Sequence, residues 1–513
     1  MSRAKVYLRN LTANWIGYGL NLVIMFAMSP FVIHRLGDVD YGVWSIMMTM
    51  TGYLGLVEIG TRGGLGRFIN FYLGKKDYEK MNGTINTAMV MFIVVGVILL
   101  LVSTILVIFL PQIFSKIPET LLPDAQIILC LISFNVWMSF YNAAFRQVLT
   151  AHERFELVNL SDIIVLLLRT GATVVALLSG HRLVTLAVIQ TATSLLGLLV
   201  VLLLAHKICP FLEIKLRLAS KERFKELFGF SIWAFIGDLS YRLLYSADTI
   251  VIGILLGPKW VTYYSVGGLL LYRSREFINQ ASSIFAPKMM QDCATGNLAS
   301  LRSTYQRGSN LVMGVCILLF VGMLSFGKEF IILWMGHQFE ISYRILAILT
   351  TSSFMAVSVQ VGGPIFAGMH RVKLSALLTL TQGLINLGLT IFFVSDLQWG
   401  IEGVAWGTFF PRIIWGVIAG AIVMSWIRLD VKKFLGKTVI RWVLLGILFA
   451  AGCIFINQAI EVSGWLYWGA KVGLATFLYI PLTWFFLLDG DSRLIVTQTI
   501  RKLRSLRTSE NIS

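Results

Sequence analysis

The chain has 513 residues, of which 57% are hydrophobic and only 13% are charged, and its formal net charge at pH 7 is +17. Apolar runs of about 20 residues, the length that crosses about 30 Å of hydrocarbon, recur from one end of the sequence to the other. Because the segments between them are short, the composition excludes a soluble globular protein. It predicts an all-α membrane protein that functions within or across the bilayer.

The apolar runs define about fourteen predicted transmembrane spans. The first run contains Asn14, Asn21 and Pro30 and lacks a small-residue cleavage pattern, so we interpret it as a retained helix rather than a signal peptide. In chain order the predicted spans are residues 12–33, 41–63, 84–110, 122–147, 156–179, 183–205, 228–256, 260–286, 306–334, 341–368, 373–395, 401–426, 438–458 and 463–488.

Lysine and arginine alternate between the two sides of the predicted membrane. Thirty-one of the 43 lie at the two termini and in the even-numbered connections, including the adjoining span ends, and six lie in the odd-numbered connections. By the positive-inside rule both termini are cytoplasmic, and we expect the protein in the cytoplasmic (inner) cell membrane. The positive charge is spread over many short turns, so it predicts contact with anionic membrane lipids and no nucleic-acid partner.

Two blocks of sequence recur about 220 residues further along the chain. Residues 14–46 resemble residues 232–266, and residues 148–154 resemble residues 366–371; chance similarity of apolar sequence is the alternative for either block alone. Six spans per repeat is an even number, so the repeats form parallel bundles, a transporter architecture with the substrate site between them. The expected domains are an N-terminal six-helix bundle at 1–210, a C-terminal six-helix bundle at 211–430, two additional transmembrane helices at 431–490 and a basic cytoplasmic tail at 491–513.

Four short motifs lie at residues 54–60 (LGLVEIG), 151–155 (AHERF), 247–257 (ADTIVIGILLG) and 284–287 (IFAP). In this order and spacing the chain resembles the polysaccharide transporters, the O-antigen and capsule flippases of the multidrug/oligosaccharidyl-lipid/polysaccharide exporter superfamily. The resemblance covers about residues 10–430, and the last two spans are similar to the extra pair of fourteen-helix lipid II flippases. One departure is Glu58, where many relatives carry Asp, which is also anionic.

The resemblance implies a flippase for an undecaprenyl-pyrophosphate-linked oligosaccharide, which it moves from the cytoplasmic to the outer leaflet by alternating access in surface polysaccharide biosynthesis. It implies neither an enzyme activity nor a cofactor. The expected partners are the lipid-linked oligosaccharide and membrane lipids, with a polysaccharide polymerase and a chain-length regulator.

Charged side chains within the spans mark the candidate site, because a charge at mid-bilayer costs on the order of 3 kcal/mol and usually faces a wet cavity or a partner. Arginine suits a diphosphate-sugar head group, since its guanidinium group binds phosphate in a bidentate manner and stays charged when buried. The predicted substrate-binding residues are Arg62, Arg169, Arg242, Arg273, Arg275 and Arg412. The predicted ion-coupling or counter-ion residues are Glu58, Asp162, Asp238, Asp248 and Glu276.

Simpler interpretations of these charges stay open. Glu58 with Arg62, Asp238 with Arg242, and Glu276 with a neighbouring arginine would neutralise one another within a helix. Asp162 shares a helical face with Arg169, seven residues on, and is either its permanent counter-ion or a group whose protonation couples transport to ion flow. Arg412 either contacts substrate or pairs with Asp162 or Asp238. Lys471 is expected to extend to the membrane surface.

Two further patterns also leave alternatives open. Gly362 to Pro364 is predicted to interrupt the span at 341–368, and this break and Pro30 are either hinges or static kinks. Five tyrosines either stack on sugar rings or fill helix contacts: Tyr241, Tyr245, Tyr263, Tyr264 and Tyr272.

Enzyme signatures such as HExxH, CxxC and GxSxG do not occur in the sequence. The nearest approach to a P-loop has Glu329 in place of Ser or Thr, so ATP is not expected to be the energy source. An ion gradient or the lipid gradient remains. A membrane glycosyltransferase or polymerase would need a large outer loop, and the predicted outward connections are too short to supply one. A multidrug or cation exporter of the same superfamily usually has twelve helices, and the fourteen spans and the central arginines argue against it.

Overall fold

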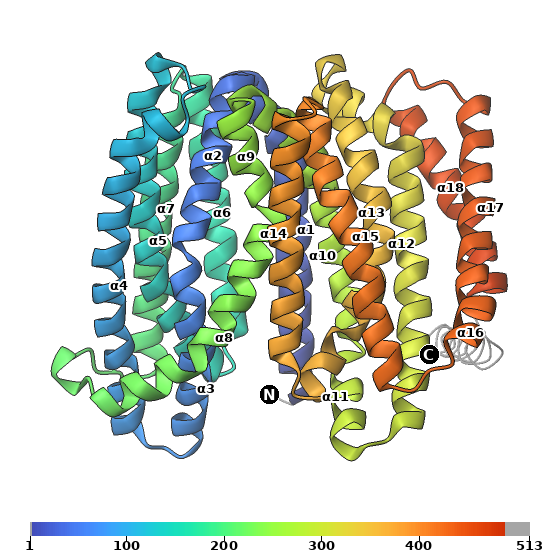
Figure 1. Cartoon of the computed structure of the whole chain (residues 1–513). Helices are drawn as coiled ribbons and strands as arrows, with labels where there is room; N and C mark the ends of the chain where they lie inside the picture. Colours follow the sequence, from blue (N-terminus) through green and yellow to red (C-terminus); the bar gives the residue numbers. More distant parts are fainter. Residues whose placement is uncertain (1–2, 488–513) are drawn as a thin grey trace, which may run out of the picture. The chain divides into compact units, whose positions relative to one another are not determined.

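The computed structural model describes the backbone of residues 3–487 and, within that range, all side chains except those at 3–16, 57–64, 228–235, 355–360 and 437. Every regular element within the described residues is a helix (Figure 1), which confirms the all-α prediction. The helices are α1 (Arg3–Leu36), α2 (Asp38–Leu54), α3 (Leu56–Gly74), α4 (Tyr78–Ile113), α5 (Leu122–Ala151), α6 (Phe155–Leu178), α7 (Leu183–Ile208), α8 (Lys221–Tyr245), α9 (Ala247–Leu255), α10 (Pro258–Ser283), α11 (Ala286–Thr295), α12 (Leu298–Met335), α13 (Glu340–Gly368), α14 (Val372–Ser395), α15 (Gly400–Trp426), α16 (Val431–Phe434), α17 (Ile440–Ala459) and α18 (Trp465–Phe486), with short turns η1 (Glu119–Leu121), η2 (Leu216–Leu218), η3 (His337–Phe339) and η4 (Leu435–Val439).

Ten of the described helical stretches are long and apolar enough to cross a membrane, so the chain is a multi-pass membrane protein. They contain α1, α4, α5, α6, α7, α12, α14, α15, α17 and α18. The other four predicted spans fall on α2 with α3, on α8 with α9, on α10 and on α13, which do not reach that length and apolarity over their described residues. The total of fourteen spans therefore stays a prediction.

Two of the predicted spans are broken at positions where the sequence has no proline. Gly55 separates α2 from α3, and Ser246 separates α8 from α9. The predicted interruption at Gly362 to Pro364 is wrong, because α13 continues through Pro364. An interior proline removes one intrahelical hydrogen bond, and a helix among other membrane helices tolerates that loss.

The chain divides into two units, each with its own core. The first comprises the residues up to Ser265 with Val394–Ile401, and the second comprises Val266–Phe393 with the residues from Glu402 onward. In the first unit α4, α5 and α7 lie side by side (Figure 1) and bury apolar side chains such as Phe92 and Phe140. The boundary between the units falls within α10, and the predicted domain limits at 210 and 430 stay predictions.

The positions of helices and turns recur along the chain at a nearly constant distance. α4 begins at residue 78 and α12 at residue 298, a separation of 220 residues. Gly37 and Gly257 are also 220 residues apart and have φ values of 89° and 101°, a conformation that favours glycine. Glu153 and His370, which are 217 residues apart, both have φ 57° in the turns after α5 and α13. These matches support the internal repeat inferred from the sequence.

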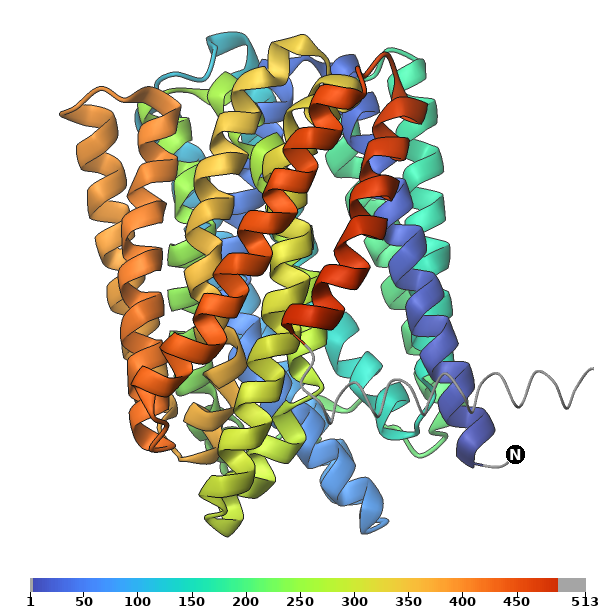
Figure 2. The same ribbon diagram turned by 90° about the vertical axis from the view of Figure 1, so that its right-hand side faces the viewer.

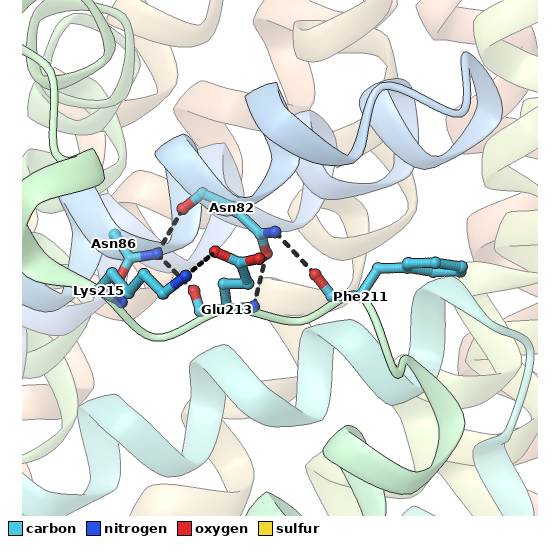
Figure 3. Close-up of polar contacts among 5 residues, drawn as sticks. All are labelled: Asn82, Asn86, Phe211, Glu213 and Lys215. Carbon is cyan, nitrogen blue, oxygen red and sulfur yellow. Dashed lines mark hydrogen bonds and ion pairs between the residues drawn. The ribbon is translucent and has the colours of Figure 1, made fainter.

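The segment between α7 and α8 is attached to α4 by two asparagine amides (Figure 3). The Asn82 side chain donates to the carbonyl of Phe211 at 2.8 Å and accepts from the amide of Glu213 at 3.2 Å. The Asn86 side chain donates to the carbonyl of Glu213 at 2.7 Å and accepts from the amide of Lys215 at 2.8 Å. The amides thus act as a neighbouring strand would, satisfying backbone groups at alternate residues. The connection is therefore fixed to the first unit.

Helices α17 and α18 adjoin α12 in the second unit (Figure 2). The side chain of Lys471 is only 1% exposed, and its ammonium group donates to Glu329 on α12 at 2.8 Å and to the Asn457 amide oxygen on α17 at 3.0 Å. The prediction that Lys471 extends to the membrane surface is wrong, because two other helices supply polar partners inside the protein. The three side chains join the last two helices to α12.

Candidate functional site

A polar cavity of about 400 Å³ lies within the first unit, between α1, α5, α6 and α7. It is a candidate binding site because such a concave, polar-lined space within membrane helices admits a hydrophilic group. The cavity is lined by Asn21, Asn135, Met138, Ser139, Asn142, Ala143, Arg146, Ser161, Asp162, Val165, Leu166, Arg169, Ser194 and Gly197.

Asp162 pairs with Arg146, which the sequence analysis did not select. The two guanidinium nitrogens Nη1 and Nη2 of Arg146 lie 2.5 and 2.7 Å from the two carboxylate oxygens of Asp162, a bidentate arrangement. Both side chains remain accessible, with 30% of Arg146 and 51% of Asp162 exposed. Arg146 was missed because it falls at the end of the predicted span 122–147, where it was counted with the cytoplasmic charges, whereas α5 continues to Ala151.

Arg169 lines the same cavity, as the spacing from Asp162 predicts, but it is bound by neutral groups. Its Nε donates to the Thr193 hydroxyl at 3.1 Å and its Nη2 donates to the Ser194 hydroxyl at 2.9 Å. The structure therefore does not pair Asp162 with Arg169. Among the described lining residues the charged groups are two arginines and one aspartate, so the cavity has a net positive charge.

The cavity wall also has an unsatisfied acceptor. The side-chain oxygen of Asn142 is buried and has no hydrogen-bond partner among the described residues. Leaving such a group unsatisfied costs about 1–3 kcal/mol, so it favours a ligand or water that donates a hydrogen bond. A hydroxyl group would meet that need.

A second polar cluster in the first unit contains Asp238 and Arg242, which form the predicted pair within α8 at 3.2 Å. The Arg242 guanidinium group lies close to Gly52 of α2, where an added Cβ would be 2.8 Å from Nη1. The hydroxyl of Tyr53 donates to the Arg242 carbonyl at 3.0 Å. The pair thus lies against α2, just before the break at Ser246.

The five tyrosines of the sequence prediction differ in accessibility. Tyr264 is buried and donates to the buried carboxylate of Asp248 at 2.5 Å, and Tyr263 is buried and donates to Asp38 at 2.8 Å. Tyr241 and Tyr272 are about half exposed, at 46% and 48%. Tyr263 and Tyr264 are therefore held inside the protein by hydrogen bonds, whereas Tyr241 and Tyr272 are partly accessible. Tyr241 also contacts the ring of Tyr245, with ring centroids 4.5 Å apart.

In the second unit, α10 positions Arg273, Arg275 and Glu276. Arg273 forms an ion pair with Glu276 at 2.7 Å and lies 5.5 Å from the centre of the Tyr272 ring. This is the within-helix neutralisation that the sequence left open, combined with a cation–π contact. Arg275 lies in the same turn of α10.

Arg412 on α15 is buried, with 4% exposure. Its Nη1 donates to the Leu349 carbonyl at 3.3 Å and to the hydroxyls of Ser352 and Ser353, both at 3.2 Å, on α13. These contacts join α13 to α15. Asp162 and Asp238, the other partners considered for Arg412, form the ion pairs with Arg146 and Arg242 described above.

Glu58 and Arg62 fall at residues whose side chains lie outside the described part of the structure. Their mutual pairing and their role in a site stay predictions.

Comparisons with known proteins agree with the motifs. The family described as "Polysaccharide biosynthesis protein" matches residues 7–287, more than half of the chain. The uncharacterized membrane protein EpsK of Bacillus subtilis is 20% identical over 500 residues, which cover 96% of this chain and 98% of that protein. A putative O-antigen transporter of Shigella flexneri is 20% identical over 425 residues, which cover 82% of this chain and 97% of the relative.

Among solved structures, the lipid II flippase MurJ in an inward closed conformation matches with a TM-score of 0.70 and 13% identity, over 91% of this chain and 97% of that one. At this identity the likeness shows a shared fold. With the family match over more than half of the sequence, it confirms the resemblance inferred from the four motifs: the chain belongs to the polysaccharide biosynthesis protein family.

Proposed function

We propose that the protein is a flippase that moves an undecaprenyl-pyrophosphate-linked oligosaccharide from the cytoplasmic to the outer leaflet by alternating access. It lies in the inner membrane with both termini in the cytoplasm, and it supplies glycan to a polymerase and a chain-length regulator. The names of the O-antigen transporter and of the lipid II flippase support a lipid-linked glycan as substrate.

The observation that carries this proposal is the positively charged polar cavity among the membrane helices of the first unit. A diphosphate-sugar head group cannot cross hydrocarbon unaided, because each exposed charge and hydroxyl group loses its water. The cavity supplies guanidinium groups from Arg146 and Arg169 and an unsatisfied amide oxygen from Asn142. These groups replace water around phosphate and sugar hydroxyl groups.

The predicted arginines act with the cavity in this proposal. Arg62, Arg242, Arg273 and Arg275 are the further proposed contacts for the acidic head group, whereas Arg412, predicted as a sixth contact, is buried and bound to α13. Glu58, Asp162, Asp238, Asp248 and Glu276 keep the empty protein from being too positive and are the candidates for ion coupling. An inside-negative membrane potential favours outward movement of an anion by about 2.3 kcal/mol per charge per 100 mV.

The function is tested with purified protein in proteoliposomes. The substrate is undecaprenyl-pyrophosphate-linked oligosaccharide with a fluorescent glycan, and an impermeant quencher reports the leaflet that holds the label. We expect the protein to speed exchange between leaflets well above that of protein-free liposomes, and the cationic dye ethidium to remain untransported. Exchange no faster than in protein-free liposomes contradicts the proposal, and ethidium transport instead supports a multidrug exporter.

The orientation is tested separately by labelling. Cysteines introduced at Asp38, Gly180 and Ser463 should react with an impermeant thiol reagent outside the cell, and cysteines at Lys76 and Lys221 should not. The reverse pattern contradicts cytoplasmic termini.

A further inference from the structure

The ion pair between Arg146 and Asp162 gives the cavity of the first unit a property beyond simple cation binding. We propose that this cavity is an anion-binding subsite in which Asp162 competes with the bound anion for Arg146. The ligand class is a diphosphate or other acidic group attached to a hydroxyl-bearing sugar. Only the identity of that ligand rests on the proposed function, since the charges and contacts are those of the described residues.

The geometry makes the competition direct. Asp162 occupies Nη1 and Nη2 of Arg146, the same pair of donors that a phosphate group would use. The pair is not sealed from solvent, because half of the Asp162 side chain and nearly a third of Arg146 are exposed. An anion can therefore reach the guanidinium group, and a displaced carboxylate can be hydrated.

Arg169 supplies the second cation of the subsite. It lies seven residues after Asp162 on α6, which corresponds to about 10 Å along the helix. Its hydrogen bonds to Thr193 and Ser194 hold the guanidinium group in place without cancelling its charge. The Asn142 oxygen on the cavity wall accepts a hydrogen bond from a hydroxyl group. Together these groups fit an anion joined to a sugar better than a bare inorganic ion.

The competition sets the affinity of the cavity for an anion. The charged groups that face Asp162 among the described lining residues are Arg146 from α5 and Arg169 from its own helix, while α1 and α7 contribute the neutral Asn21 and Ser194. Loss of the Asp162 charge releases Arg146, so the anion then binds more tightly. The carboxylate lowers the affinity, which allows the ligand to leave after it has been carried across.

The test measures binding of P1-geranyl-P2-methyl diphosphate, a diester without a proton that titrates near neutral pH, to the full-length protein in nanodiscs by calorimetry. Asp162→Asn should bind roughly tenfold more tightly than the wild type at pH 7.5, because it removes one charged hydrogen-bonding competitor. Arg146→Ala and Arg169→Ala should each weaken binding roughly tenfold.

The double variant Arg146→Ala/Asp162→Asn distinguishes competition from a general effect of charge. If Asp162 acts through Arg146, the gain from Asp162→Asn disappears in the Arg146→Ala background. Arg344→Ala, which breaks an exposed arginine–carboxylate pair with Glu402 at 3.1 Å, is the matched control and should bind as the wild type does. Thermal unfolding of each variant verifies folding, and Arg146→Gln, which also removes the charge, replaces Arg146→Ala if the latter does not fold.

The proposal is overturned if Asp162→Asn binds no more tightly than the wild type, or if its gain persists without Arg146. Failure of the flippase proposal looks different. In that case the probe binds with the expected pattern while the lipid-linked oligosaccharide is not exchanged between leaflets. Exchange without the binding pattern leaves the flippase proposal intact and removes the subsite.

Discussion

Two ion pairs between membrane helices show how the same chemistry serves different purposes. Arg146 and Asp162 join α5 to α6, and Lys471 and Glu329 join α18 to α12, with contacts of 2.5 and 2.8 Å. Asp162 is 51% exposed beside a cavity, whereas Lys471 is 1% exposed and also bound by Asn457. Accessibility, more than the presence of charge, therefore separates a candidate binding group from a contact that fixes helices together.

The largest expected effect comes from breaking the ion pair between Lys471 and Glu329. Lys471→Met leaves Glu329 without its cation and should lower the free energy of unfolding by about 3–5 kcal/mol. Thermal or denaturant unfolding in detergent measures the loss. The double variant Lys471→Met/Glu329→Gln should recover most of it, because no charge is then left unpaired. A single variant as stable as the wild type would mean that the pair does not hold α18 in place.

Arg412 and Arg169 give the next comparison. Arg412→Ala removes a buried guanidinium group that binds one carbonyl and two hydroxyls of α13. It should lower the free energy of unfolding by about 1–3 kcal/mol and should also reduce transport. Arg169→Ala should abolish most transport and cost less than about 1 kcal/mol, because its partners line a cavity that water can fill. Unfolding and glycan exchange are measured on the same preparations. Equal losses of stability in Arg412→Ala and Arg169→Ala would contradict the view that Arg412 joins helices while Arg169 lines a cavity.

The asparagine contacts of α4 should have a smaller and more local effect. Asn82→Ala or Asn86→Ala removes two hydrogen bonds to the connection before α8, each contributing about 1 kcal/mol. We expect faster amide hydrogen exchange at Glu213 and Lys215, measured by mass spectrometry. Asn70→Ala, which removes a bond within α3, is the control and should leave this segment unchanged. If amide exchange is unchanged in both Asn82→Ala and Asn86→Ala, other contacts hold the connection.

The smallest expected effect concerns Asp292 on α11, outside the predicted spans. Hydrogen bonds from Lys288, and then from Ser300 and Thr304, hold the pKa of Asp292 below its usual 3.8. Its folded-state pKa lies below the unfolded value, so the stabilisation is present above pH 3.8 and is lost as the pH falls through the folded pKa.

Asp292→Asn should therefore cost less than about 1 kcal/mol near neutral pH, since Lys288 is largely exposed. The cost should disappear in acid. Unfolding midpoints of both proteins at pH 7 and below pH 3.8 test this, and a constant difference would rule out the charge as its cause.

The membrane class, the all-α fold and the family could be inferred from the sequence alone, and the sequence also predicts the internal repeat. These follow from local quantities: the length of apolar runs, the order of short motifs, and the positions of glycine turns such as Gly37 and Gly257. It also identified Asp162 and Arg169 as residues of one helical face, and Asp238 and Arg242 as a pair, because helical periodicity fixes neighbours within one helix.

Which charges meet across helices depends on the tertiary structure. Arg146 approaches Asp162 from another helix, Lys471 meets Glu329 142 residues away, and Arg412 binds α13. Helical periodicity carries no information about the partner helix or about the rotation of one helix against another. The helix breaks at Gly55 and Ser246 were also missed, because neither residue is a proline. Conversely, α13 continues through Pro364, because neighbouring membrane helices let a helix tolerate an interior proline.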